Sequence, residues 1–348
     1  MFAMKNGVYG VAVAAVMSAG CVFAQLSDED ALKAARETLA RMTLEEKTQL
    51  LAGSGTMTIS AIPRVGITNE WMMSDNSSTV RPQMNRWEWG CTQPISENTK
   101  LPSLSALAQT WDVEWARKHG ETLGAEMRDR GVDELLGPGV NIARTPLNGR
   151  NWEYLGEDPL LAGRLAGRFA KGLQSVKVSP CMKHYVCNDQ EWCRTVIDVD
   201  VSERALREVY ARPFEIAVKK ADPWAVMNSY NAVRGTFAAW NAPLHDLLFG
   251  FGFSGAVYAD WGGFRDFTKA WNGGTTFETD VRTRDEPTTQ RLVKQLEAGG
   301  FDRARFDEAV RRALVHCFRI GAFDRDTPAE KRLQERCEKA FGGAEHAA

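Results

Sequence analysis

An acidic residue follows a short apolar run toward the C-terminus, in the segment Ala256-Val257-Tyr258-Ala259-Asp260-Trp261-Gly262-Gly263. The apolar run predicts a buried parallel strand. A carboxylate buried there without partners would cost several kcal/mol of folding free energy, and barrel enzymes place their chemistry at the carboxyl ends of parallel strands. We therefore predict that Asp260 is a catalytic nucleophile.

Polar residues also end other predicted strands. They are Asp75, the pair Lys183 and His184, and Asn228 to Tyr230. A further polar motif, 149–153, contains Arg150. Arginine, lysine and histidine donate hydrogen bonds to ligand oxygens, whereas aspartate accepts them from hydroxyls and can also attack carbon. A closed barrel would bring such strand ends to one mouth, and an open sheet would spread them along one edge.

These polar residues also have structural explanations. Arg150 could pair with Glu153 or Glu157 and serve the scaffold alone, and His184 could be a hydrogen-bonded core histidine. Because His184 follows Lys183 at a strand end, we favour contact with a ligand. The other charged residues of these segments are expected to be scaffold rather than chemistry: Glu153, Glu157, Asp158, Glu191 and Arg194.

Helical and strand-like segments alternate along the chain. Apolar periodicity and capping residues predict helices over 27–53 (in two pieces, the second opened by Thr43 and Glu46), 111–130, 159–174, 203–220 and 302–320. Short apolar runs predict strands at 135–136, 180–186, 224–230 and 254–260. This alternation indicates an α/β fold with a parallel sheet. The chain has neither a dinucleotide-binding glycine motif nor a Walker motif, which disfavours a nucleotide-binding fold.

The composition is that of a globular protein. Of 348 residues, 25% are charged and 44% hydrophobic, and the net charge is −2. This balance gives no reason to expect nucleic acid or an anionic membrane as a partner. Most of the 11 tryptophans are expected to pack in the core, although flat indoles also serve as stacking platforms for sugars.

Residues 1–24 have the pattern of a secretory signal peptide. Lys5 precedes the apolar run 11–17, and a cleavage site is expected after Ala24. The run is too short to span a bilayer, so we expect export to the periplasm or the medium. Cys21 follows a segment that loosely imitates a lipid-attachment box, which leaves a lipoprotein as the alternative.

Export would permit disulfides. The cysteines beyond the leader are Cys91, Cys181, Cys187, Cys193, Cys317 and Cys337. Their spacing fits no zinc pattern, so no metal is expected. A bridge between Cys187 and Cys193 and buried free thiols both remain open.

Several motifs together resemble the N-terminal barrel domain of glycoside hydrolase family 3, of the beta-glucosidase type. They are Gly137-Pro138-Gly139-Val140-Asn141-Ile142, Gly149-Arg150-Asn151-Trp152-Glu153, Lys183-His184, Met227-Asn228-Ser229-Tyr230-Asn231 and Tyr258-Ala259-Asp260-Trp261-Gly262. The resemblance runs from about Ala61 to Asp324. It implies a TIM-like (β/α)8 barrel, regular or irregular, over 25–325. Residues 326–348 would then be a helix or linker toward a missing second domain.

The resemblance also implies a retaining exo-acting beta-glycosidase that releases terminal, non-reducing beta-D-glucosyl residues from beta-glucosides or oligosaccharides. Asp260 would form the glycosyl-enzyme, and no metal or other cofactor would be required. The residues that would bind the sugar are Asp75, Arg150, Lys183, His184, Met227, Tyr230 and Trp261. Asp75 is followed by Asn76-Ser77, where the family usually has Gly-Pro, and this difference bears on sugar specificity.

The resemblance further bears on the acid/base carboxylate. In two-domain members this group comes from the second domain, whereas single-domain members carry a histidine shortly after the Lys-His motif. No histidine lies between Tyr185 and Leu244, so the acid/base residue is expected to be absent from this chain. A beta-xylosidase or broader exo-beta-glycosidase is the alternative enzyme, and a catalytically impaired sugar-binding barrel is the alternative of another class.

Overall fold

A computed structural model describes residues 28–52, 58–67, 71–80, 99–130, 132–278 and 286–323. The predicted leader and the segment 326–348 lie outside these residues, as do Cys21, Cys91 and Cys337. In the part of the chain that is described, no helix is both long and apolar enough to cross a membrane.

The main sheet has the strand order β1-β2-β3-β4-β6-β9. These strands are β1 (Thr58–Ile59), β2 (Trp71–Ser74), β3 (Glu134–Leu135), β4 (Ser179–Tyr185), β6 (Ala225–Asn228) and β9 (Ala256–Tyr258). β1 is antiparallel to β2, and every other neighbouring pair is parallel. The carboxyl ends of β2, β3, β4, β6 and β9 therefore lie along one edge.

The α/β prediction is confirmed. An eight-stranded closed barrel was expected, whereas the described residues form an open sheet from β1 to β9. Beyond β9, the described residues add only a parallel bridge between Tyr258 and Phe277. A separate small sheet comprises β5 (Asp198–Val199), β7 (Ala232–Val233) and β8 (Thr236–Phe237).

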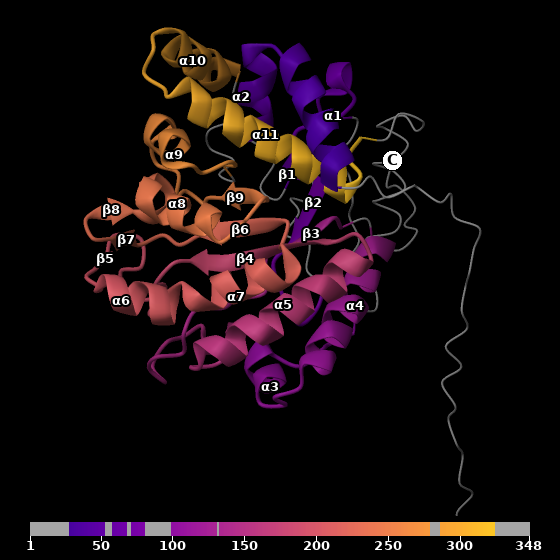
Figure 1. The fold of residues 1–348 in the computed structure, drawn as a ribbon, viewed down its shortest axis with the longest axis vertical. Helices are drawn as coiled ribbons and strands as arrows, with labels where there is room; N and C mark the ends of the chain where they lie inside the picture. The colour runs from indigo at the N-terminus through magenta and orange to yellow at the C-terminus, as the bar shows by residue number, and fades with distance from the viewer. Residues whose placement is uncertain are drawn as a thin grey trace, which may run out of the picture.

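Helices cover both faces of the sheet. They are α1 (Asp28–Arg41), α2 (Leu44–Ala52), α3 (Leu104–Ala108), α4 (Val113–Asp129), α5 (Pro159–Ser175), α6 (Glu203–Ala205), α7 (Arg212–Ala221), α8 (Ala242–Gly250), α9 (Phe267–Gly273), α10 (Glu286–Glu297) and α11 (Arg303–Ile320). Figure 1 shows α1, α2, α10 and α11 on one side of the sheet and α4, α5 and α7 on the other. The predicted helix 203–220 is interrupted by a π-helical turn, η3 (Leu206–Tyr210).

Local sequence signals explain where several helices begin and end. Thr43 and Glu46 form the predicted capping box, with reciprocal hydrogen bonds of 2.9 and 3.2 Å. The side chain of Asp158 caps α5 by accepting from the backbone N–H of Leu161. Gly321 ends α11 at φ 78°, the left-handed conformation that glycine adopts most readily.

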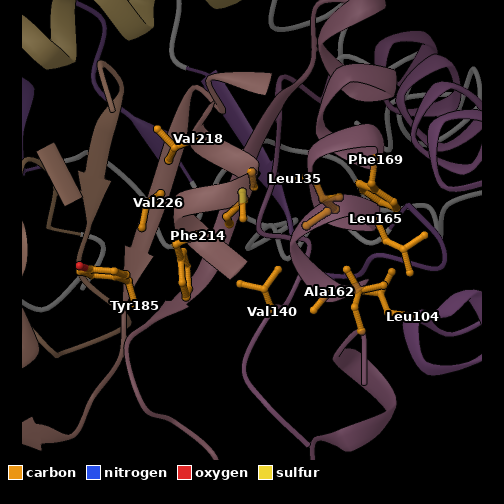
Figure 2. Close-up of a cluster of buried hydrophobic side chains, with 14 of the residues drawn as sticks. Leu104, Leu135, Val140, Ala162, Leu165, Phe169, Tyr185, Phe214, Val218 and Val226 are labelled. Atoms are coloured by element: carbon orange, nitrogen blue, oxygen red, sulfur yellow. The ribbon is translucent and has the colours of Figure 1, made fainter. Parts of the chain in front are cut away.

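The two faces of the sheet belong to two buried clusters because side chains alternate along each strand. Val226 and Val257 pack with α4, α5, α7 and α8 in one cluster, and Figure 2 shows side chains of this cluster, among them Phe169, Phe214 and Val226. Their neighbours Met227 and Tyr258 face the other cluster, which contains residues of α1, α2, α9, α10 and α11.

Helices α4 and α5 pack unusually closely at two glycines. A Cβ on Gly120 would lie 2.2 Å from the carbonyl oxygen of Phe169, and a Cβ on Gly172 would lie 2.2 Å from that of Arg117. No real Cβ approaches an oxygen so closely. The two glycines thus allow backbone to touch backbone between the helices.

A polar network lies inside the cluster that contains α11. The hydroxyl of Tyr258 donates to Oε2 of Glu134 at 2.8 Å, and Nε2 of His316 lies 3.3 Å from the same oxygen. All three side chains are inaccessible to solvent. Burial raises the pKa of Tyr258 well above its ordinary value, so its hydroxyl remains a donor.

The N-terminal helices pack against the C-terminal end of the described chain. α1 contacts α11, and α2 contacts both α10 and α11. Nζ of Lys47 lies 2.8 Å from Oδ1 of Asp307, joining α2 to α11. The first and last described helices are therefore neighbours in space, although they are far apart in the sequence (Figure 1).

The cysteines in the described residues are unbonded. Cys187 and Cys193 do not form the bridge that the sequence left open. Cys181, Cys187 and Cys317 are buried thiols, and Cys193 is exposed.

Candidate active site

The polar edge of the main sheet brings the predicted site residues together. Asp75 directly follows β2, Lys183 and His184 lie on β4, Tyr230 follows β6, and Asp260 follows β9. The remaining predicted members are Arg150, which precedes the 3-10 turn η2 (Asn151–Glu153), Met227 on β6 and Trp261. Figure 1 shows these strands side by side, as the pairing requires.

An irregularity in β4 turns two consecutive side chains toward the site. Lys183 pairs with Met227 of β6, the next pair is Tyr185 with Asn228, and His184 is skipped. In a regular strand, Lys183 and His184 would point to opposite faces. The register shift, like that of a β-bulge, breaks this alternation, and both side chains reach charged groups of the site.

Asp260 is almost completely buried, with 7% of its surface exposed. Its Oδ1 accepts a hydrogen bond of 2.9 Å from the backbone N–H of Trp261, and the hydroxyl of Tyr230 also donates to the carboxylate. Burial raises the pKa of Asp260 above its ordinary value, and the positive charges of Lys183 and Arg150 limit the rise. The carboxylate is therefore dehydrated but held by directed donors.

Lys183 is held between two carboxylates. Its Nζ lies 2.7 Å from Oδ1 of Asp75 and 2.8 Å from Oε1 of Glu153. Burial acts to lower the pKa of Lys183, but the charges of Glu153 and Asp75 outweigh it and raise the pKa. The ammonium group is thus charged at neutral pH.

Arg150 forms a two-point ion pair with the same Glu153. Its Nε and Nη2 donate to the two carboxylate oxygens at 2.8 and 2.7 Å. Burial acts to raise the pKa of Glu153, but Lys183 and Arg150 lower it to about 2. Of the two acidic partners that the sequence offered Arg150, the structure selects Glu153 rather than Glu157.

Acidic and basic side chains continue to alternate beyond Arg150, through Glu191 to Arg194. Oε1 of Glu191 lies 4.0 Å from Nε of Arg150, and its Oε2 accepts from Arg194 at 2.9 Å. The guanidinium of Arg194 lies 4.9 Å from the ring centre of Tyr230. Tyr230 in turn donates to Asp260, so this sequence of contacts leads back to the predicted nucleophile.

His184 is buried and uncharged at neutral pH. Burial, together with Arg150 and Lys183, lowers its pKa well below the ordinary value. Asn141 fixes its backbone by accepting from the His184 N–H at 2.7 Å and donating to the His184 carbonyl at 2.9 Å. Nε2 of the imidazole lies 3.7 Å from Oδ2 of Asp260.

Met227 and Trp261 supply apolar surface beside these polar groups. Met227 is buried between Lys183 and Tyr258 in the strand register, and Trp261 is partly buried and packs against the same cluster. A site with charged donors and apolar side chains suits a ligand with hydroxyls and C–H faces.

The sequence did not identify two contacts that hold the site together. Glu153 was expected to be scaffold and a candidate partner of Arg150, and the structure adds Lys183 as its second cation. Its position three residues after Arg150 on a helical turn was the available signal. Asn141 lies 43 residues before its partner His184, and no local pattern links the two.

Comparison with known proteins places the chain in a family. Residues 85–315 match the model of the glycosyl hydrolase family 3 N terminal domain. The chain belongs to this family. N-terminal domains of this family are TIM-like barrels, as the sequence predicted for this chain. The described residues form an open sheet of such a barrel.

Relatives of this glycosyl hydrolase family 3 chain include Beta-glucosidase BoGH3A of Bacteroides ovatus, 39% identical over 307 residues that cover 84% of this chain and 41% of the relative. Beta-glucosidase B of Emericella nidulans is 38% identical, covering 86% and 35%. Among solved structures, beta-glucosidase 3B of Thermotoga neapolitana in complex with alpha-D-glucose is similar at a TM-score of 0.74 and 34% identity, covering 88% and 46%. The chain spans less than half the length of these relatives.

Proposed function

We propose that this chain supplies the nucleophile and the sugar-binding residues of a retaining exo-acting beta-glycosidase of the beta-glucosidase type. The observation that carries the proposal is the buried Asp260 carboxylate at the end of β9, held by Tyr230 and the Trp261 N–H and faced by Lys183 and Arg150. The beta-glucosidase names of the relatives and the glucose complex of the Thermotoga neapolitana enzyme support it.

In the proposed reaction, a carboxylate oxygen of Asp260 attacks the anomeric carbon of the terminal sugar. The bond from that carbon to the leaving oxygen breaks, and this oxygen takes a proton from a general acid. Water then attacks the anomeric carbon of the glycosyl ester, which frees the Asp260 carboxylate, and the water proton passes to the acid/base group. The donors and cations around Asp260 favour the ionised carboxylate and orient it before the attack.

The surrounding residues would bind the sugar. Lys183 and Arg150 donate to hydroxyl oxygens, Asp75 accepts from a hydroxyl, and neutral His184 can do either. Their ion pairs restrict these side chains to one arrangement, so little conformational entropy is lost when the sugar binds. Trp261 offers an apolar face to the C–H groups of the ring.

The described carboxyl groups that pair with Lys183, Arg150 and Arg194 are poorly suited to act as the general acid. Glu153, with a pKa of about 2, is ionised at neutral pH and has no proton to give. Asp75 accepts from Lys183, and Glu191 accepts from Arg194. We therefore propose that the acid/base carboxylate comes from outside this chain. Without it, cleavage of unactivated glycosides should be slower by about 10²–10⁴-fold.

The test uses a substrate whose leaving group needs no protonation. The purified chain is incubated with 2,4-dinitrophenyl 2-deoxy-2-fluoro-beta-D-glucoside, and its intact mass is measured beside that of an Asp260→Asn variant. The proposal expects release of dinitrophenol and a covalent adduct on the parent, with neither on the variant. A folded parent without an adduct would contradict it. If such a parent still bound glucose, the sugar-binding barrel would be the better description.

A second comparison addresses the sugar. Dinitrophenyl beta-D-glucoside and beta-D-xyloside differ by the C6 hydroxymethyl group. A ratio of kcat/KM that strongly favours the glucoside would support a beta-glucosidase. Equal values or a preference for the xyloside would indicate the broader exo-beta-glycosidase or the beta-xylosidase.

A further inference from the structure

Glu153 serves two cations with one buried carboxylate. Its Oε1 accepts from Nζ of Lys183 at 2.8 Å and from Nη2 of Arg150 at 2.7 Å, and its Oε2 accepts from Nε of Arg150 at 2.8 Å. Only 9% of the Glu153 side chain is exposed. Both cations therefore depend on the same group for their position.

The groups that face Asp260 come from several elements. Lys183 and neutral His184 lie on β4, Arg150 precedes η2, and Tyr230 follows β6. These are joined by the backbone N–H of Trp261. Among the described residues, Lys183 and Arg150 are the cations that lower the pKa of Asp260, and both are bound by Glu153.

Asp75 and Glu191 are the other carboxylates that lie near Lys183 or Arg150. Asp75 binds Lys183 at 2.7 Å, and Glu191 lies 4.0 Å from Arg150. Among the described ion pairs, each of these carboxylates is paired with only one of the two cations. Glu153 alone is paired with both.

We propose that Glu153 is a positioning residue that holds Lys183 and Arg150 in place and, through them, sets the ionisation and the reactivity of Asp260. The proposal rests on the proposed role of Asp260 as nucleophile. It assigns Glu153 no contact with the sugar or with the reacting atoms.

The physical argument concerns the balance of charge around Asp260. The negative charge of Glu153 partly neutralises Lys183 and Arg150. If Glu153 loses this charge, the two cations act on Asp260 without that neutralisation. Their attraction for the Asp260 carboxylate then increases, which lowers its pKa. A carboxylate stabilised in this way is also a weaker nucleophile, since the positive charges must be overcome when its electrons move to the anomeric carbon. Glu153 thus keeps the two cations close without letting them neutralise Asp260.

The experiment measures the Asp260 carboxyl directly. Protein labelled with ¹³C at the aspartate carboxyl carbons is titrated by NMR, and the Asp260 signal is assigned by its loss in Asp260→Asn. In Glu153→Gln we expect the pKa of Asp260 to fall by about one pH unit or more. An unchanged pKa in a folded Glu153→Gln protein would overturn the proposal.

Matched variants separate this role from general charge effects and from misfolding. Glu191→Gln removes the same charge beside Arg150 alone, so the pKa of Asp260 should fall less than in Glu153→Gln; an equal fall would also overturn the proposal. Glu153→Asp keeps the charge but is too short to reach both cations. If Glu153→Gln fails to fold, the pKa of Asp260 is measured in Glu153→Asp instead. We expect it to lie below that of the parent, by less than is expected for Glu153→Gln. An unchanged pKa in Glu153→Asp would then refute the proposal.

A kinetic measurement on the same variants distinguishes this proposal from the proposed function. In the parent, the rate of labelling by the dinitrophenyl fluoroglucoside should decline at acidic pH as Asp260 is protonated. In Glu153→Gln, this decline should occur at a lower pH, and the maximum rate should also be lower than in the parent. If the parent is never labelled, the proposed function fails, while the NMR titration still decides whether Glu153 controls Asp260.

Discussion

The imidazole Nε2 of His184 lies 3.7 Å from Oδ2 of Asp260, and both side chains are buried. This separation is too long for a hydrogen bond. Burial also keeps the imidazole uncharged, so the pair is not an ion pair. In the proposed function, one hydroxyl of the sugar could contact both groups at this separation.

The buried charge of Asp260 should reduce the stability of the protein at neutral pH. Its pKa is raised on folding from an ordinary value of 3.8, so the folded protein binds more protons than the unfolded chain between the two values. Stability then falls as the pH rises through this window. We expect Asp260→Asn to have a higher Tm than the parent at pH 7 and an equal Tm below the ordinary pKa of aspartate. A lower Tm for the variant at pH 7, measured by calorimetry, would contradict this expectation.

Removal of Lys183 should be costly, because it leaves buried acidic groups without their partner. We expect Lys183→Met to lose about 3–5 kcal/mol of unfolding free energy and to lose measurable glucose binding. Lys219→Met is the control, since Lys219 forms an exposed pair with Glu215 on α7 that should be worth about 0–1 kcal/mol. Urea denaturation measures both, and similar losses in the two variants would show that the Lys183 cluster contributes no special stability.

The hydroxyl of Tyr258 should contribute to stability without affecting the proposed sugar site. Tyr258→Phe removes its 2.8 Å hydrogen bond and leaves an oxygen of buried Glu134 with one partner fewer. We expect a loss of about 1–3 kcal/mol and an unchanged glucose dissociation constant. Tyr210→Phe, which removes an exposed contact with Arg144, should cost less than about 0.5 kcal/mol. If Tyr258→Phe is as stable as this control, the network is not structural.

The packing of α5 predicts opposite effects for two of its glycines, because Gly172 lies against α4 and Gly167 lies against α7. Gly172→Ala forces a methyl group against a backbone oxygen, so we expect a loss of about 1–3 kcal/mol. At Gly167, the nearest atom to a new Cβ is 3.4 Å away, and alanine should gain about 0.5–1 kcal/mol by its better helix propensity. Thermal unfolding of the two variants gives the sign of each change in stability, and a Gly172→Ala variant as stable as the parent would refute the close contact between α4 and α5.

Elements with strong local signals were predictable from the sequence. The capping box at Thr43, the amphipathic pattern of α4 and the stop at Gly321 all reflect interactions within a few residues, and the structure confirms them. The strand ends that carry Asp75, Lys183 and Asp260 were found in the same way, because each follows a short apolar run.

Other elements lacked such signals. α8 has apolar residues around most of its circumference, so it shows no helical periodicity. α10 carries a sparse apolar face that includes buried Leu292 and Leu296. β1 is two residues long, too short for an alternation to be recognised, whereas β3, which is equally short, lies within one residue of the strand predicted at 135–136. The existence of β1 depends on its antiparallel pairing with β2 rather than on its own two residues.

The same distinction between local signals and long-range contacts applies to the candidate site. Its residue types were predictable, but the partner of each was not. Lys183 and Asp75 are 108 residues apart, and Asn141 and His184 are 43 apart. Such pairs arise from the order of strands in the sheet, which the sequence of one chain does not display. The choice of Glu153 over Glu157 by Arg150 likewise depended on the turn η2.

The packing of α1 and α2 against α11 has a consequence for synthesis of the chain. Leu50 and Leu51 of α2 belong to the same cluster as Phe306 and Val310 of α11. During translation, α2 leaves the ribosome long before α11 exists, and its apolar face has no final partner in that interval. Exposed surface of this kind makes a nascent chain prone to aggregation and a target for chaperones. The earliest described helices to be made thus reach their native environment only when the last one emerges.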